Sequence, residues 1–98
     1  MLEIEAGDDG RIILKGRLDT AQCAKAQSFL DTLESPDVLD FADLDYISSA
    51  GLGVLLIVQK RAMKAGGGLR IINVNKHIND IFRFSGFDKI FKIESVIT

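Results

Sequence analysis

Two adjacent serines, Ser48 and Ser49, are the residues of this sequence best placed to do chemistry. They follow an apolar segment ending at Ile47 and precede a long apolar run beginning near Ala50, so we expect them where a strand passes into a helix. A serine at a helix start can act as an N-cap that accepts a backbone N–H. It can also carry a phosphoryl group, which the free N–H groups and the helix dipole would stabilise. The residues alone leave both interpretations open.

Catalytic combinations of residues are poorly supported. The serines do not lie in a Gly-x-Ser-x-Gly arrangement, and the nearby sequence shows no base that would activate a hydroxyl. The single histidine, His77, is predicted on the polar side of a short helix. The glycines at 66–68 lack the lysine and the following helix of a phosphate-binding loop. We therefore expect no catalytic residue and no cofactor.

Metal and redox sites find little support either. Asp40, Asp43 and Asp45 come nearest to a carboxylate cluster, but Asp40 falls within a strand and no glutamate or histidine completes a ligand set. The single cysteine, Cys23, excludes an intramolecular disulfide. Its position on an apolar helical stripe predicts a buried structural thiol. We expect no metal site.

Composition gives the broad class of protein. The 98 residues are 47 % hydrophobic and 27 % charged, which is typical of one globular domain spanning 1–98. A formal net charge of -2 with mixed signs argues against direct nucleic acid binding. The start shows no signal peptide, and the longest apolar run, 54–58, is far shorter than a membrane span. These observations predict a cytoplasmic domain without membrane insertion.

Hydrophobic periodicity predicts the elements that position the serines. Asp19 or Thr20 can cap the first helix, and Ser35-Pro36 should end it. The pattern predicts an α/β fold, a mixed β-sheet of four to five strands whose last three are parallel, with helices packed mainly on one face. In chain order we expect strands at 2–6 and 11–18, a helix, a strand at 38–42, a helix at about 50–65, a strand at 69–74, a helix from Asn75 to Gly86 and a strand at 91–94.

The helix after the serines is predicted to present two surfaces. Its first half is apolar nearly all round, so one side should face the core and the other should be available to a partner. Gly51 and Gly53 would leave room for another macromolecule to approach the turn. The expected core side consists of Leu52, Leu55, Leu56, Ala62 and Met63, and the apolar residues outside that stripe are Val54, Ile57 and Val58.

The stretch Leu44-Asp45-Tyr46-Ile47-Ser48-Ser49-Ala50-Gly51-Leu52-Gly53-Val54-Leu55 resembles the signature of STAS domains, specifically of stand-alone bacterial anti-sigma factor antagonists. Gly16-Arg17-Leu18-Asp19 and Ser85-Gly86-Phe87-Asp88-Lys89-Ile90-Phe91 resemble two further segments of that family, so the resemblance spans nearly the whole chain. Two positions depart from the family pattern. Ser48 stands where the family has an aspartate, and Ala50 stands where it has a second serine.

This resemblance implies a function by partner switching. The unphosphorylated protein would bind an anti-sigma factor that is also a serine kinase of the histidine-kinase-like ATPase type, which frees a sigma factor. Phosphorylation of Ser49 would release the protein, and a PP2C-type phosphatase would reverse the modification. Ser48 is a second candidate acceptor. The expected partner-binding residues are Asp19, Ser48, Ser49, Ala50, Gly51, Leu52, Gly53, Val54, Ile57 and Val58.

Two other functions stay open at this point. A STAS subunit of a membrane lipid-transport ABC complex would keep a hydroxyl at the same turn without being phosphorylated. A nucleotide-binding STAS module would bind GTP or ATP.

Overall fold

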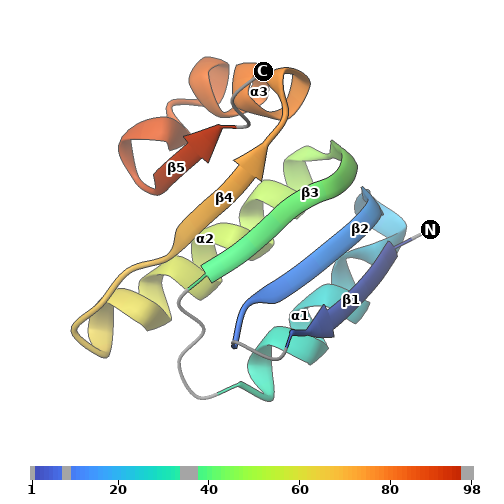
Figure 1. The fold of residues 1–98 in the computed structure, drawn as a ribbon. Coiled ribbons are helices and arrows are strands. Elements are labelled where there is room, and N and C mark those ends of the chain that lie inside the picture. The colour runs from blue at the N-terminus through green and yellow to red at the C-terminus, as the bar shows by residue number, and fades with distance from the viewer. Residues whose placement is uncertain (1, 8–9, 34–37, 96–98) are drawn as a thin grey trace.

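One five-stranded sheet, with its strands side by side in chain order, is the frame of the molecule (Figure 1). The computed structural model describes residues 2–7, 10–33 and 38–95, so the helix end predicted at Ser35-Pro36 lies outside the described residues. The strands are β1 (Leu2–Ala6), β2 (Ile12–Leu18), β3 (Val38–Ile47), β4 (Arg70–Val74) and β5 (Lys92–Ser95). β1 and β2 correspond to the first two predicted strands and form an antiparallel hairpin. From β2 to β5 every neighbouring pair is parallel, so the parallel set is one strand larger than the predicted three.

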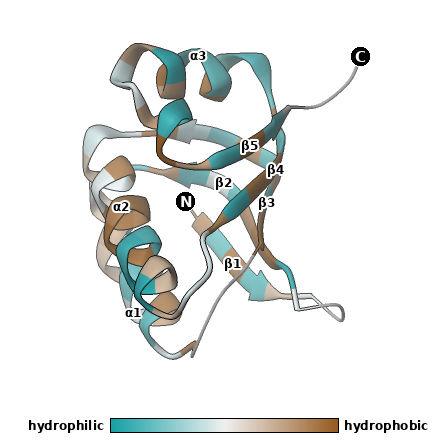
Figure 2. Ribbon diagram, turned by 90° about the vertical axis from the view of Figure 1, so that its left-hand side faces the viewer, coloured by the Kyte–Doolittle hydropathy of each residue, from teal (hydrophilic) through white to brown (hydrophobic). Residues whose placement is uncertain are grey.

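The helices follow the strands and lie mainly on one side of the sheet. Two of them, α1 (Cys23–Asp31) and α2 (Ser49–Lys64), pack together against one face, as Figure 2 shows in side view. The third, α3 (Lys76–Ser85), follows β4 and contacts β3. Short 3-10 turns, η1 (Thr20–Gln22) and η2 (Phe87–Lys89), precede α1 and follow α3. The predicted α/β fold with helices on one face is confirmed.

The core fills the space between the sheet and its helices. Leu14 of β2, Phe41 of β3 and Leu55 of α2 are fully buried. The ring of Phe82 from α3 lies 6.4 Å from the ring of Phe41 and 6.3 Å from that of Phe91, between centroids. Aromatic pairs at this spacing add to the stabilisation from their buried area. These contacts hold α3 against the sheet.

The buried side of α2 is wider than the sequence pattern predicted. Leu52, Leu55 and Ala62 are buried as expected, but Val54 and Val58 are buried too. Met63, predicted in the core, is 59 % exposed. Because α1 packs beside α2 while the sheet lies beneath it, two sides of the helix are covered. The placing of Val54 and Val58 outside the core, and of Met63 within it, was therefore wrong.

A buried polar side chain fastens the carboxyl half of α2 to the sheet. Gln59 is only 4 % exposed. Its Oε1 accepts a hydrogen bond from the Leu69 backbone N–H at 2.7 Å, and its Nε2 donates to the Ile90 carbonyl at 2.7 Å. The side chain therefore links α2 to the chain entering β4 and to the end of η2.

A second contact joins the last turns of α2 to α1. The Arg61 guanidinium donates to the carbonyl oxygens of Leu30 and Leu33 at 3.2 and 2.9 Å, and to the carboxylate of Asp31 at 3.1 Å. A cation at a helix carboxyl end satisfies carbonyl groups that lack an intrahelical donor. Arg61 thus caps α1 from the side.

Candidate functional site

The serine turn connects the end of β3 to the start of α2 at the carboxyl edge of the sheet (Figure 1). The Ser48 N–H donates to the Leu18 carbonyl at 2.9 Å, which ties the turn to the end of β2. Ser48 is the N-cap of α2: its Oγ accepts from the Gly51 N–H at 3.1 Å, and its carbonyl accepts from the Leu52 N–H at 2.9 Å. The backbone and the side chain of Ser48 are therefore both engaged in starting the helix.

Ser49 is the first residue of α2, and its side chain is exposed. No residue in the described ranges donates to its hydroxyl or accepts from it. The first N–H groups of an α-helix have no intrahelical acceptor, so a phosphoryl group on this hydroxyl would meet free donors and the positive end of the dipole. The two serines thus differ: Ser48 caps the helix, while Ser49 presents a free hydroxyl.

The two glycines of the turn also differ. A Cβ added to Gly51 would lie 2.8 Å from the Leu18 carbonyl oxygen and 2.9 Å from the Ile47 side chain. The turn therefore approaches β2 too closely for any side chain at this position. A Cβ added to Gly53 would meet nothing within 4 Å. Space for another macromolecule to approach was expected at both glycines, but it is present only at Gly53.

The residues predicted to bind a partner separate into a buried and an exposed set. Leu52, Val54 and Val58 are buried against the sheet and α1, so their assignment to a docking surface was wrong. Gly51 is buried against β2. Ile57 is 51 % exposed. The predicted residues that reach the surface are Asp19, Ser48, Ser49, Ala50, Gly53 and Ile57, with Asp19, Ser48 and Gly53 half-buried.

Asp19 lies beside the serine turn because it follows Leu18, whose carbonyl accepts the Ser48 N–H. Its side chain accepts from the Gln22 N–H at 3.2 Å, so the predicted capping role is confirmed, at η1 rather than directly at α1. Arg17 flanks it, with Nε 3.9 Å from the Asp19 carboxylate. The Arg17 guanidinium lies over the Tyr46 ring, 4.4 Å from its centroid, as in a cation–π pair. This pair could not be predicted from the sequence, because it depends on the register of β2 against β3.

The other reactive residues are dispersed. Cys23 is half-buried rather than buried, and its thiol donates to the Asp19 carbonyl at 3.2 Å. His77 is exposed on α3. Asp40 is buried and accepts from Arg11 at 2.9 Å and from the Asn73 amide at 3.1 Å. In the ranges that the structure describes, no three histidine, cysteine or acidic side chains come together as metal ligands.

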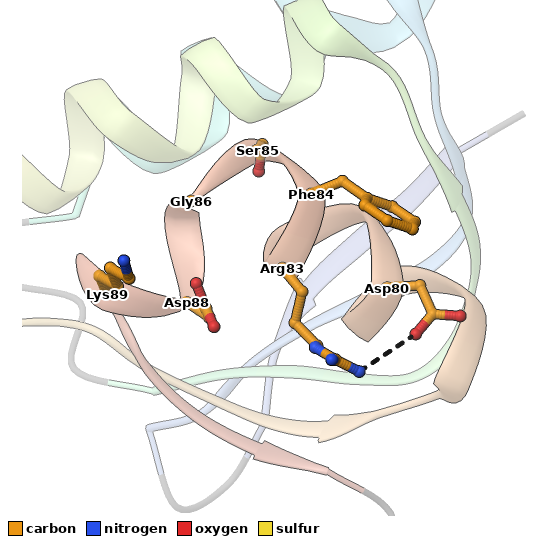
Figure 3. Close-up of a pocket in the computed structure, with 7 residues that line it drawn as sticks. All are labelled: Asp80, Arg83, Phe84, Ser85, Gly86, Asp88 and Lys89. Carbon is orange, nitrogen blue, oxygen red and sulfur yellow. Dashed lines mark ion pairs between the residues drawn. The ribbon is translucent and has the colours of Figure 1, made fainter.

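A hollow of about 460 Å³ lies where α3 passes into η2 (Figure 3). The Asp80 carboxylate and the Arg83 guanidinium point toward one another across 3.9 Å. Phe84 is 90 % exposed. The Ser85 hydroxyl donates to the Phe82 carbonyl at 3.1 Å, so no base activates it. This hollow contains no arrangement for nucleophilic catalysis.

The fold and the turn define a small α/β domain that presents a free hydroxyl at a helix N-terminus. The family profile described as "Mlab, STAS domain" matches residues 2–96. The chain belongs to the STAS domain family, as the resemblance around Ser49 indicated. In the described part of the chain, no helix combines the length and the apolar character needed to span a membrane.

One related sequence and solved structures of two further proteins are similar to the chain. BtrV of Bordetella bronchiseptica, named as an anti-sigma factor antagonist, is 37 % identical over 91 residues, which are 87 % of this chain and 78 % of BtrV. A structure of an anti-sigma factor antagonist from Thermotoga maritima has a TM-score of 0.79 at 22 % identity, covering 99 % of this chain and 88 % of that one. SpoIIAA, a Bacillus cell fate determinant and anti-sigma factor antagonist, matches in its unphosphorylated form with a TM-score of 0.69 at 15 % identity, covering 100 % and 90 % of the two chains. Its phosphorylated form matches with a TM-score of 0.68 at 16 % identity, covering 98 % and 92 %.

Proposed function

We propose that this protein is an anti-sigma factor antagonist that acts by partner switching in the cytoplasm, with Ser49 as its phosphoacceptor. The observation that carries the proposal is the difference between the two serines. Ser48 is occupied as the N-cap of α2, whereas the exposed Ser49 hydroxyl has no partner in the described ranges. The relatives named as anti-sigma factor antagonists support the same function. The protein acts by binding, without a catalytic group of its own.

The proposed partner is an anti-sigma factor that is also a serine kinase of the histidine-kinase-like ATPase type, and a PP2C-type phosphatase reverses the modification. The docking surface surrounds Ser49 and includes Ala50, Gly53 and Ile57. A phosphoryl group on Ser49 adds about two negative charges, and removing them from water opposes docking. Phosphorylation therefore releases the partner.

Phosphorylation of the purified protein by its anti-sigma factor kinase tests the acceptor. With ATP present, we expect one phosphoryl group on the wild type and none on Ser49→Ala, measured by intact mass. Ser48→Ala is the matched control: it removes the cap, at about 1 kcal/mol, but leaves the proposed acceptor in place. It should still be phosphorylated. Full modification of Ser49→Ala would show that Ser48 or another hydroxyl is the acceptor.

Affinity for the same kinase tests the release. Ser49→Asp should bind at least about tenfold more weakly than the wild type, which corresponds to about 1.4 kcal/mol, and Ser49→Ala should bind as the wild type does. Isothermal titration with the kinase gives both values. Equal affinities for all three proteins would contradict the proposal.

Two other results would favour the alternative functions. Capture of an ABC ATPase instead of the kinase, unaffected by Ser49→Asp, would favour the lipid-transport subunit. Saturable binding of GTP or ATP to the protein alone would favour a nucleotide-binding module.

A further inference from the structure

Gly53 is a residue of α2 whose type the fold itself does not explain. It lies in the interior of the helix, where glycine is less stable than alanine because its backbone loses more conformational freedom on folding. The fold gives no reason for glycine at this position. Its φ is not positive, and a Cβ would meet nothing within 4 Å. Gly51, two residues earlier, is required by its contact with Leu18.

The exposed line of α2 extends from Ser49 through Gly53 to its carboxyl end. The face of the helix opposite the core carries five residues that are four, four, three and four positions apart, namely Ser49, Gly53, Ile57, Lys60 and Lys64. Ile57 on this line is half exposed. Lys60 and Lys64 are exposed, and neither makes a hydrogen bond or an ion pair with any residue in the described ranges. We call this line, Ser49, Gly53, Ile57, Lys60 and Lys64, the outer line of α2.

The two lysines differ from the arginine between them. Arg61 is used within the fold, where it holds the end of α1. Lys60 and Lys64 make no hydrogen bond or ion pair within the described residues, on a protein whose formal net charge is -2. Cations of this kind attract carboxylates on a partner and speed its approach.

We propose that an acidic amphipathic helix of the anti-sigma factor crosses α2 at Gly53, with its apolar side on Ile57 and carboxylates opposite Lys60 and Lys64. The absence of a side chain at Gly53 lets the backbone of the partner helix approach that of α2 closely. This inference rests on the proposed function and deepens it, because it specifies the chemistry and the position of the partner surface.

The same arrangement explains how a phosphoryl group on Ser49 would act. Ser49 lies four residues from Gly53, about 6 Å along the helix axis. This separation is shorter than the Debye length of about 8 Å at physiological ionic strength. The two added charges would therefore act where the partner helix crosses α2, because removing them from water at the crossing point opposes docking without moving α2.

The central test is Gly53→Ala, measured against the purified anti-sigma factor kinase that binds the wild type. Alanine should raise the midpoint of thermal unfolding by about 4–8 °C, since it removes the helix penalty of glycine. Affinity for the kinase should nevertheless fall by at least about tenfold. A more stable protein that binds less well cannot be explained by misfolding. Unchanged affinity, or a lower unfolding midpoint, would overturn the role given to Gly53.

The charge on the outer line is tested by the double variant Lys60→Glu/Lys64→Glu. We expect a fall in affinity of at least about tenfold and a weaker dependence of affinity on salt. The control, Lys76→Glu/Lys89→Glu, makes the same change of net charge at exposed positions of α3 and η2. It also breaks the ion pair between Lys76 and Asp80, and it should bind as the wild type does. Equal losses in the two double variants would overturn the acidic partner surface.

The affinities of these variants for the kinase distinguish a failure of this inference from a failure of the proposed function. If the wild type binds the kinase and Ser49→Asp weakens binding, while Gly53→Ala and Lys60→Glu/Lys64→Glu leave it unchanged, only the partner geometry is wrong. If no anti-sigma factor kinase binds the wild type, the proposed function fails and the inference fails with it.

Discussion

Replacing Gln59 by leucine is expected to lower the thermal unfolding midpoint by about 10–20 °C. Leucine has a similar volume, so the loss comes from hydrogen bonding rather than from a cavity. The Leu69 N–H, which Gln59 Oε1 accepts at 2.7 Å in a buried setting, would be left without a partner. The Ile90 carbonyl would lose its donor as well. An unsatisfied buried group and a lost hydrogen bond together cost about 2–3 kcal/mol.

Thermal and urea unfolding monitored by circular dichroism measure this effect. The matched control is Gln27→Leu on α1, which removes an exposed hydrogen bond to Asp31 and should change stability by less than about 0.5 kcal/mol. Because Gln59 is far along α2 from the serine turn, the folded variant should still be phosphorylated at low temperature. A midpoint equal to that of the wild type would show that the contacts of Gln59 do not form in solution.

Replacing Gly51 by valine is expected to destabilise the protein by about 2–4 kcal/mol and to disturb the site directly. The added Cβ would begin 2.8 Å from the Leu18 carbonyl oxygen, a backbone atom that cannot rotate away. The start of α2 must then move off β2, which weakens the 2.9 Å hydrogen bond from the Ser48 N–H to that carbonyl. Gly51→Ala should show the same effect at about half the size, because alanine favours the helix while its Cβ makes the same clash.

The two glycines therefore make a matched pair. Gly51→Ala should lower the unfolding midpoint, whereas Gly53→Ala should raise it, although the two residues belong to the same helix. Thermal unfolding of the two variants side by side checks this. A higher unfolding midpoint for Gly51→Ala than for the wild type would contradict the close contact between the turn and β2.

Local signals in the sequence predicted the helix ends well. The helix predicted from Asn75 to Gly86 has these two residues at its ends: Asn75 caps α3 by accepting from the Ile78 N–H at 2.9 Å, and Gly86 ends it in the left-handed region with a φ of 78°. Both roles depend on a few neighbouring residues and on the backbone freedom of glycine. Interactions between residues that are close together along the chain can be predicted from one sequence.

Burial on α2 could not be predicted in the same way. Val54 and Val58 are covered because α1 lies beside α2, and periodicity within one helix carries no information about a second helix. The serine pair posed a similar problem. Two hydroxyls in adjacent positions are chemically alike, and only the path of the chain after β3 shows that Ser48 is used as the cap.

The anchoring of α2 at both ends has a consequence for signalling. Its start is bonded to β2 through Ser48, and its carboxyl half is bonded to the end of η2 through Gln59 and to α1 through Arg61. These contacts oppose a movement of the helix in response to one modified side chain. If Ser49 is phosphorylated as proposed, the modification would change the surface charge beside α2 and leave the position of the helix unchanged. Partner exchange would be timed by the kinase and the phosphatase, with no slow refolding step between the two states.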